Sequence, residues 1–280
     1  MYKIGMSSCA FPLNEEVFQS LSQHGIQAIE IAMSGEEIDK LDFQEVFALS
    51  RRYQVQLWSC HLPFSPWGTL DISTPDEAMR RRTIEYYREL IRKASDIGVA
   101  IFVLHPSLEP IAPENREQMI SYAMDSLREL AQIAADNNAV IAIEDLPRTC
   151  LGNTAEEMHK LLSADERLRV CFDTNHLLQD TQLNFVEKLG DKIVTLHVSD
   201  YDYADERHWL PGEGKINWHE LYAALKAANY TGVWMYEVPM ELPTHPDRIQ
   251  NLARRRDLTL DDFVCNAEEI FAEKQPCAIK

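Results

Sequence analysis

The feature that most constrains the fold of this chain is a regular alternation of two kinds of segment. Short runs of β-branched and other apolar residues are each followed by a longer amphipathic stretch, and the pattern recurs eight times. Eight strand–helix units in about 250 residues are typical of a (β/α)8 barrel, with parallel strands inside and helices outside. We therefore predict an α/β fold, a single TIM barrel. The apolar runs cover residues 3–9, 28–33, 55–64, 101–107, 139–147, 168–176, 193–200 and 232–238.

The stretches between the runs have the periodicity of helices. Residues 77–97 carry apolar side chains at mostly three- and four-residue steps, which forms one apolar stripe, and residues 118–136 do the same. Thr154 is followed three residues later by Glu157, the spacing of a capping box, and residues 218–228 supply another helix. Gly98 is a helix-stop residue directly before the fourth run.

An open, doubly wound α/β sheet is the alternative fold for the same alternation. A nucleotide-binding sheet of that kind needs a Gly-rich phosphate loop after a strand, and neither GxGxxG nor GxxxxGK[ST] follows any run. No low-complexity tract or Pro/Gly-rich linker divides the chain. Residues 1–280 are therefore expected to form one domain, with 240–280 as a C-terminal extension that ends in a helix. This extension is also the candidate interface for a homo-oligomer.

Composition and charge exclude several classes of protein. The formal net charge of −18 disfavours a nucleic-acid partner, because binding to phosphates requires a basic surface. No apolar run approaches the roughly 18 residues of a membrane helix, and the N-terminus lacks the pattern of a signal peptide. The six cysteines are scattered, without a CxxC pair, and Cys60 and Cys171 lie inside apolar runs. We expect reduced thiols and a cytoplasmic location, with no membrane association.

Potential metal ligands gather at the ends of the predicted strands. In a TIM barrel the carboxyl ends of the strands form the active-site face, so residues at these positions are candidates for chemistry. His176 follows the sixth strand and His208 lies in the loop after the seventh. The other four histidines, at positions 24, 159, 219 and 245, are expected on the surface. The candidates at strand ends are His61, His105, Glu144, Asp173, His197 and Glu237.

The alternation of side chains along the strands predicts which of these candidates point into the barrel. His197 shares its side of the strand with Thr195, opposite larger apolar residues, and Glu144 shares its side with Ala142. Small and polar residues suit the barrel axis, whereas large branched ones pack outward on the helices. Four consecutive strands are therefore expected to direct one set of side chains at a single point: Glu144, Asp173, His197 and Glu237.

Three carboxylates and one imidazole at one buried point repel each other unless a cation lies among them. Oxygen-rich ligation with one nitrogen suits Mn²⁺, Zn²⁺, Co²⁺ or Mg²⁺, and the residue types do not choose between these ions. Any one strand-end carboxylate is more often a helix cap or a salt-bridge partner than a ligand. It is the joint placement on four successive strands that predicts a divalent-metal site. Glu30, in the second run, is not assigned a role.

Several segments of the chain resemble the xylose isomerase-like TIM barrels. This superfamily contains sugar phosphate isomerases and epimerases, and also the apurinic-site endonucleases with three zinc ions. The resemblance extends from about residue 55 to residue 240 and is specific for the superfamily rather than for one reaction. The segments are HLPF (61–64), LHPS (104–107), IEDLP (143–147), FDTNH (172–176), LHVSD (196–200), RHWLPGEGKINW (207–218) and YEV (236–238).

The resemblance to the sugar epimerases implies a divalent-metal-dependent isomerase or epimerase. Its substrate would be a small carbohydrate: a sugar, keto-sugar or sugar phosphate. The predicted four-residue set would bind one ion, with Glu144 and Glu237 as the acid/base pair on opposite faces of the substrate. His176 and Arg207 would contact substrate oxygens. A proton would leave the carbon beside a ketone, the metal would stabilise the enediolate, and reprotonation would complete the reaction.

The resemblance to the endonucleases implies a different reaction, phosphodiester hydrolysis with up to three zinc ions. That branch uses two further strand-end histidines, which match His61 and His105. Its third set matches His176, Glu206 and His208, with Glu206 where the branch carries Asp. The net charge favours the isomerase with one ion per chain over a DNA-binding enzyme. A barrel that binds a metal or sugar without turnover is a third hypothesis, against which the two glutamates argue.

Overall fold

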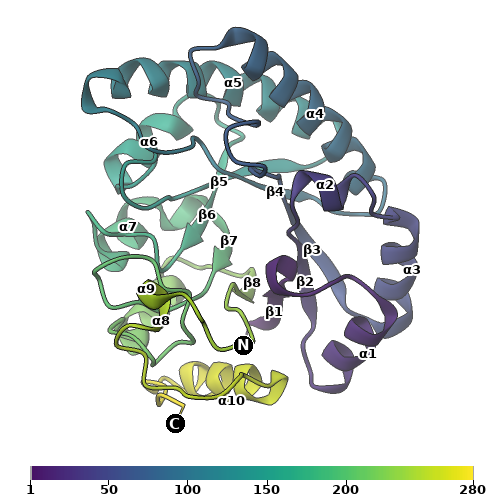
Figure 1. The fold of residues 1–280 in the computed structure, drawn as a ribbon, viewed down its shortest axis with the longest axis vertical. Coiled ribbons are helices and arrows are strands. Elements are labelled where there is room, and N and C mark those ends of the chain that lie inside the picture. Colours follow the sequence, from purple (N-terminus) through teal and green to yellow (C-terminus); the bar gives the residue numbers. More distant parts are fainter. Residues whose placement is uncertain (1, 280) are drawn as a thin grey trace.

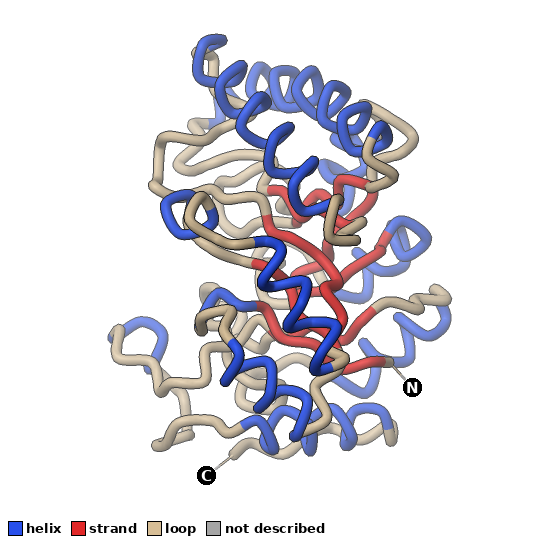
Figure 2. Tube along the Cα trace, turned by 90° about the vertical axis from the view of Figure 1, so that its right-hand side faces the viewer, coloured by secondary structure: helices blue, strands red, loops and turns tan. Residues whose placement is uncertain are grey.

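The protein is a TIM barrel, as the alternation predicts. The computed structural model describes residues 2–279 and contains eight parallel strands in the order β7-β6-β5-β4-β3-β2-β1-β8. A parallel bridge between Val198 and Tyr236 joins the two ends of this order, so that the ring closes. Helices surround the strands on the outside (Figures 1 and 2). The alternative of an open doubly wound sheet is therefore wrong.

Each predicted apolar run contains one strand, but every strand is shorter than its run. The difference lies mainly at the carboxyl ends, where the chain leaves the ladder while its side chains stay buried; Leu62, just after β3, is an example. His105 and Glu237 consequently lie one residue beyond their strands. The strands are β1 Lys3–Ser7, β2 Ala28–Ile31, β3 Gln56–His61, β4 Ile101–Leu104, β5 Val140–Glu144, β6 Arg169–Asp173, β7 Ile193–His197 and β8 Val233–Tyr236.

The predicted helices are present, with one correction at a helix start. Thr154 caps α6 by accepting a hydrogen bond from the backbone of Glu157 at 3.3 Å. The Glu157 carboxylate instead accepts from Arg116 and from the backbone of Gly152, so the reciprocal half of the capping box is not formed. The helices are α1 Glu15–Gln23, α2 Gly35–Ile38, α3 Phe43–Tyr53, α4 Glu77–Ser95, α5 Arg116–Asp136, α6 Ala155–Leu162, α7 Gln182–Leu189, α8 Trp218–Ala227, α9 Pro246–Ile249 and α10 Leu260–Phe271.

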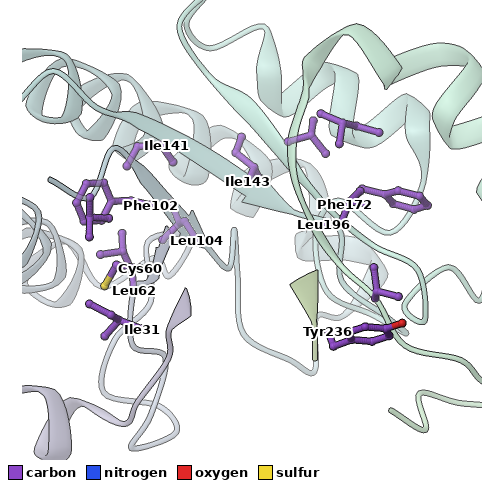
Figure 3. Packing of buried hydrophobic residues seen from close by; sticks show 14 of the residues in the cluster. Ile31, Cys60, Leu62, Phe102, Leu104, Ile141, Ile143, Phe172, Leu196 and Tyr236 are labelled. Atoms are coloured by element: carbon purple, nitrogen blue, oxygen red, sulfur yellow. The ribbon is translucent and has the colours of Figure 1, made fainter. Parts of the chain in front are cut away.

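The strands carry different side chains on their outer and inner faces. Large apolar residues of the strands, Phe172 and Leu196 among them, form the core between the strands and the helices (Figure 3). Phe172 stacks on Phe185 of α7, with ring centroids 5.1 Å apart. The inner face carries smaller residues, among them Val103, Ala142 and Cys171. This division confirms the strand parity expected from the sequence. The inside of the barrel is thereby left free for polar side chains at the carboxyl ends of the strands.

The segment after β8 returns to the barrel and holds the long loop between β7 and α8. The Arg254 guanidinium donates to the Glu213 carboxylate at 2.9 Å, with both side chains fully buried. From α10, which lies beside α8 in Figure 1, Asn266 donates to the carbonyl of Pro211 at 2.8 Å. The loop is therefore anchored by the C-terminal segment. All six cysteines are free thiols, and no helix within residues 2–279 has both the length and the apolar character to cross a membrane.

Candidate metal centre and cavity

Four side chains from neighbouring strands meet at the carboxyl end of the barrel. Glu144, Asp173, His197 and Glu237 each offer one ligand atom, and these atoms lie within 4.8 Å of one another. The His197 Nδ1 atom is 3.0 Å from Glu144 Oε1 and 3.4 Å from Glu237 Oε2. The same nitrogen is 3.9 Å from Asp173 Oδ2. The structure thus brings together the four residues that strand position and parity predict.

One oxygen in this group is suited to a cation. Asp173 is fully buried, and its Oδ1 accepts a hydrogen bond from the backbone of Asn175 at 2.7 Å. Its Oδ2, which points to the other three ligands, accepts no hydrogen bond from any described residue. A buried carboxylate oxygen without a donor is costly unless a cation or a proton neutralises it. Three carboxylates and one imidazole therefore fit a divalent cation.

The carboxyl groups at this centre do not share one charge state. Burial raises the pKa of Glu237 to about 7 and also raises the pKa of Asp173. Burial opposes ionisation of Glu144 as well, but the imidazoles of His197 and His105 outweigh it and hold the pKa of that carboxyl well below its usual range. These pKa shifts reduce the total negative charge of the three carboxyl groups. A divalent cation would neutralise that charge more completely.

Two more histidines approach the second oxygen of Glu144. His61 Nε2 lies 3.0 Å and His105 Nε2 lies 3.2 Å from Glu144 Oε2. The opposite nitrogen of His61 is held by the carbonyl of Leu62 at 2.9 Å, and the His105 ring stacks on Phe64. Burial lowers the pKa of His105 to about 4, so its imidazole is neutral and can offer a lone pair. His61, His105 and Glu144 form a second group with metal-ligand spacing.

A third group lies beside the central one, with His176 Nδ1 3.6 Å from Asp173 Oδ2. His176 Nε2 is 3.3 Å from Glu206 Oε2, and these two residues and His208 have ligand atoms within 4.8 Å of one another. The Nδ1 atom of His176 is fixed by the carbonyl of Asp145 at 2.9 Å. His208 has a positive φ of 54°, a backbone conformation that turns it back toward β8 rather than into solvent. The structure therefore brings together every histidine predicted at the rim.

A cavity of about 320 Å³ opens above these groups. Glu144 and Glu237 both line it, whereas Asp173 and His197 are fully buried beneath. Aromatic side chains form part of its wall, and Trp67 at the rim remains 55% exposed. A cavity of this size suits a small ligand such as a monosaccharide. The other charged or imidazole-bearing residues of the lining are His105, Glu109, Arg148, His176, Glu206, His208 and Arg248.

Arg207 is the one predicted site residue that neither joins a ligand group nor lines the cavity. Its buried guanidinium donates to the Asp202 carboxylate at 3.1 Å, and it is not among the cavity-lining residues. The arginines that do line the cavity are Arg148 and Arg248. Arg148 adopts a φ of 53° and contacts Glu109 and the loop after β7. Nothing in the sequence marks Arg148, because its position depends on a left-handed turn after β5.

Comparisons with known proteins show the family and the fold of the chain. A family model described as xylose isomerase-like TIM barrel matches residues 18–258. An uncharacterised protein of Methanocaldococcus jannaschii is 30% identical over 244 residues, which are 82% of each chain. The fructoselysine 3-epimerase of Escherichia coli O157:H7 is 24% identical over 84% of this chain and 90% of its own. The crystal structure of a D-tagatose 3-epimerase-like protein superposes with a TM-score of 0.78 at 24% identity, and covers 97% of this chain and 99% of that one. At this identity the structural likeness concerns the fold alone.

Proposed function

The chain belongs to the xylose isomerase-like TIM-barrel family, and from this premise we propose that it is a divalent-metal-dependent isomerase or epimerase. The substrate class is a ketose, keto-sugar or sugar phosphate. Glu144, Asp173, His197 and Glu237 would hold the ion, which supplies positive charge where negative charge develops on the substrate oxygens. The epimerase names among the relatives support a carbohydrate substrate.

The observation that carries this proposal is the different position of the four residues relative to the cavity. Asp173 and His197 are fully buried and can only serve as ligands or supports. Glu144 and Glu237 also reach the cavity, so each can offer an oxygen to a bound molecule. Two carboxylates on one cavity can remove a proton from a carbon beside a ketone and return a proton to it or to its neighbour. A protein that only binds sugar does not need such a pair.

The remaining cavity residues have roles that follow from their chemistry. His176 and His208 face the cavity and can donate hydrogen bonds to substrate hydroxyl or carbonyl oxygens. Phe64 and Trp67 offer apolar surface to the carbon face of a sugar and limit the access of water. Arg207, through its contact with Asp202, supports the loop rather than the substrate.

Solvent exchange tests this proposal directly. The Mn²⁺-loaded protein is incubated in deuterium oxide with a panel of free and phosphorylated ketoses, and incorporation of deuterium beside the ketone is followed by NMR. We expect exchange with at least one ketose and a loss of about 100-fold or more in Glu144→Gln and in Glu237→Gln. Glu45→Gln, the same change at an exposed position of helix α3, should exchange at the wild-type rate. Absence of exchange across the whole panel would contradict the proposal.

A second candidate function, zinc-dependent phosphodiester hydrolysis, is favoured by one specific observation. The three ligand groups described above lie around Glu144, and together they offer nine residues for up to three ions. The charge of the protein argues against it. The net charge is −18, and within the basic run 80–82 Arg81 is paired with Glu77 and Glu129. Elemental analysis of the purified protein separates the two candidates. One ion per chain supports the isomerase, whereas three zinc ions together with cleavage of abasic DNA would establish the hydrolase.

A further inference from the structure

A fourth acidic side chain contacts the metal centre through His197. Glu30 lies on β2, on the far side of the barrel axis from β6, and its side chain is fully buried. Its Oε1 accepts a hydrogen bond from the hydroxyl of Ser7 at 3.0 Å, and its Oε2 accepts from Ser59 at 2.7 Å. These serines belong to the strands on either side, β1 and β3. The carboxylate is therefore held in one orientation by its two neighbours.

The third partner of Glu30 is the imidazole of His197. The His197 Nε2 atom is 3.0 Å from Glu30 Oε1 and 3.2 Å from Oε2, a nearly symmetrical contact with both oxygens. The other ring nitrogen, Nδ1, points to Glu144 and the remaining ligands. A neutral imidazole that binds a cation through Nδ1 carries its proton on Nε2. Glu30 is positioned to accept the hydrogen bond that this Nε2–H group donates.

A role in packing alone does not account for this arrangement. A buried carboxylate is unfavourable unless it is paired and hydrogen-bonded, and an apolar residue would fill the same space at less expense in free energy. Among the described residues, the only ion pair of Glu30 is the one with His197. Its position is thus explained by the histidine, and the position of the histidine ring is explained by the ligand group above it.

We propose that Glu30 is a positioning residue for the metal centre, which fixes the tautomer and ring orientation of His197 through the Nε2 contact. The inference rests on the proposed function, since it requires an ion at the group formed by Glu144, Asp173, His197 and Glu237. Carboxylates that orient a histidine ligand in this way strengthen the metal–nitrogen bond, and their loss typically weakens metal affinity by about 10- to 100-fold. Ser7 and Ser59 support Glu30 in turn.

The test is a graded series of metal affinities rather than an assay of activity. The dissociation constant for Mn²⁺ is measured at fixed pH by competition with a chromophoric chelator. Glu30→Gln keeps an acceptor but removes the charge, and Glu30→Leu removes both. We expect Mn²⁺ binding to weaken by about 10-fold in the first and by up to about 100-fold in the second. Ser59→Ala, which removes one hydrogen bond to the carboxylate, should weaken Mn²⁺ binding less than either Glu30 substitution does. Glu45→Gln at an exposed position of α3 is the control and should bind like the wild type.

Thermal unfolding of each variant establishes that it is folded before its affinity is compared. If Glu30→Leu does not fold, Glu30→Gln and Ser59→Ala still decide the matter. Folded Glu30 variants that bind Mn²⁺ with the wild-type dissociation constant would overturn the inference while leaving the metal centre intact. If the wild-type protein itself bound no divalent ion, the metal centre of the proposed function would be refuted, and this inference with it.

Discussion

Replacing Asp173 by Asn should stabilise the metal-free protein, although a substitution at a buried polar position usually destabilises. No residue within 2–279 donates a hydrogen bond to Oδ2 of Asp173, and the carboxylates of Glu144 and Glu237 lie within the same 4.8 Å group. An amide removes one negative charge and turns this atom into a donor toward those oxygens. The Oδ1 atom can still accept from the backbone of Asn175, as it does now at 2.7 Å.

The size of this stabilisation follows from the cost of leaving the buried Oδ2 acceptor without a hydrogen bond. An unpaired buried polar or charged acceptor costs about 1–3 kcal/mol, and this is the free energy of unfolding that the variant should gain. For a chain of this size each kcal/mol raises the unfolding midpoint by about 2–4 °C, so a rise of about 2–12 °C is expected. The wild type gains about 2.7 kcal/mol when Mn²⁺ is present at 100 times its dissociation constant. Asp173→Asn should lose most of that gain.

Asp200→Asn is the control, because Asp200 is equally buried and differs only in its partners. Its Oδ2 accepts from the backbone of Gly212 at 2.8 Å and from the Trp218 indole at 2.9 Å, and its Oδ1 accepts from two further backbone groups. An amide nitrogen there would face donors and should lower the midpoint. Both variants are unfolded thermally in EDTA and in Mn²⁺ and followed by circular dichroism. If the two substitutions shift the EDTA midpoint in the same direction, the reasoning is refuted.

Further predictions follow from buried charges. Because burial raises the pKa of Glu237 to about 7 and the carboxyl must ionise to bind a cation, the apparent Mn²⁺ affinity should fall below pH 7, by about tenfold per pH unit for each displaced proton. Calorimetry between pH 5 and 8 measures this, and a constant affinity would contradict it. In the metal-free protein the same raised pKa means that the contribution of Glu237 to stability is complete below its ordinary pKa and is lost as pH rises through 7. Arg254→Met should lower the free energy of unfolding by about 3–5 kcal/mol, because Glu213 is left buried and unpaired. The double variant Glu213→Gln/Arg254→Met should regain part of the lost free energy of unfolding, which denaturant titration measures. Equal losses in the single and double variants would show that the ion pair is not the cause.

The sequence predicts the barrel well because its signal is periodic. Each strand must bury one or both faces, so apolar runs mark the strands wherever the helices cover them. The ends of the strands are harder to predict, since a residue such as Leu62 is buried in the loop as completely as its neighbours in the ladder. The four-residue helices α2 and α9 have too few residues for any periodicity, and they could not be predicted from an apolar stripe. The division of the chain into a barrel and an extension after residue 240 stays a prediction.

The site was predictable where strand geometry alone places a side chain. The convergence of Glu144, Asp173 and His197 follows from parity, because each ends a strand whose inner positions are small or polar. Arg207 was not predictable in the same way. It lies in the loop after β7, where its guanidinium donates a hydrogen bond to Asp202 and does not reach the cavity. The role of Glu30 also needed the structure, because it depends on a contact with a strand on the other side of the barrel.

The number of ions and the type of reaction are linked through a single atom. Glu144 Oε1 faces His197, whereas Oε2 is approached by His61 at 3.0 Å and His105 at 3.2 Å. If Oε2 binds an ion together with these two histidines, it cannot also accept a proton from carbon. If only the central site is filled, Oε2 remains available as a base, with the histidines as its hydrogen-bond donors. The isomerase and the hydrolase would therefore require mutually exclusive roles of this carboxylate. The number of bound ions distinguishes the two reactions even before a substrate is known.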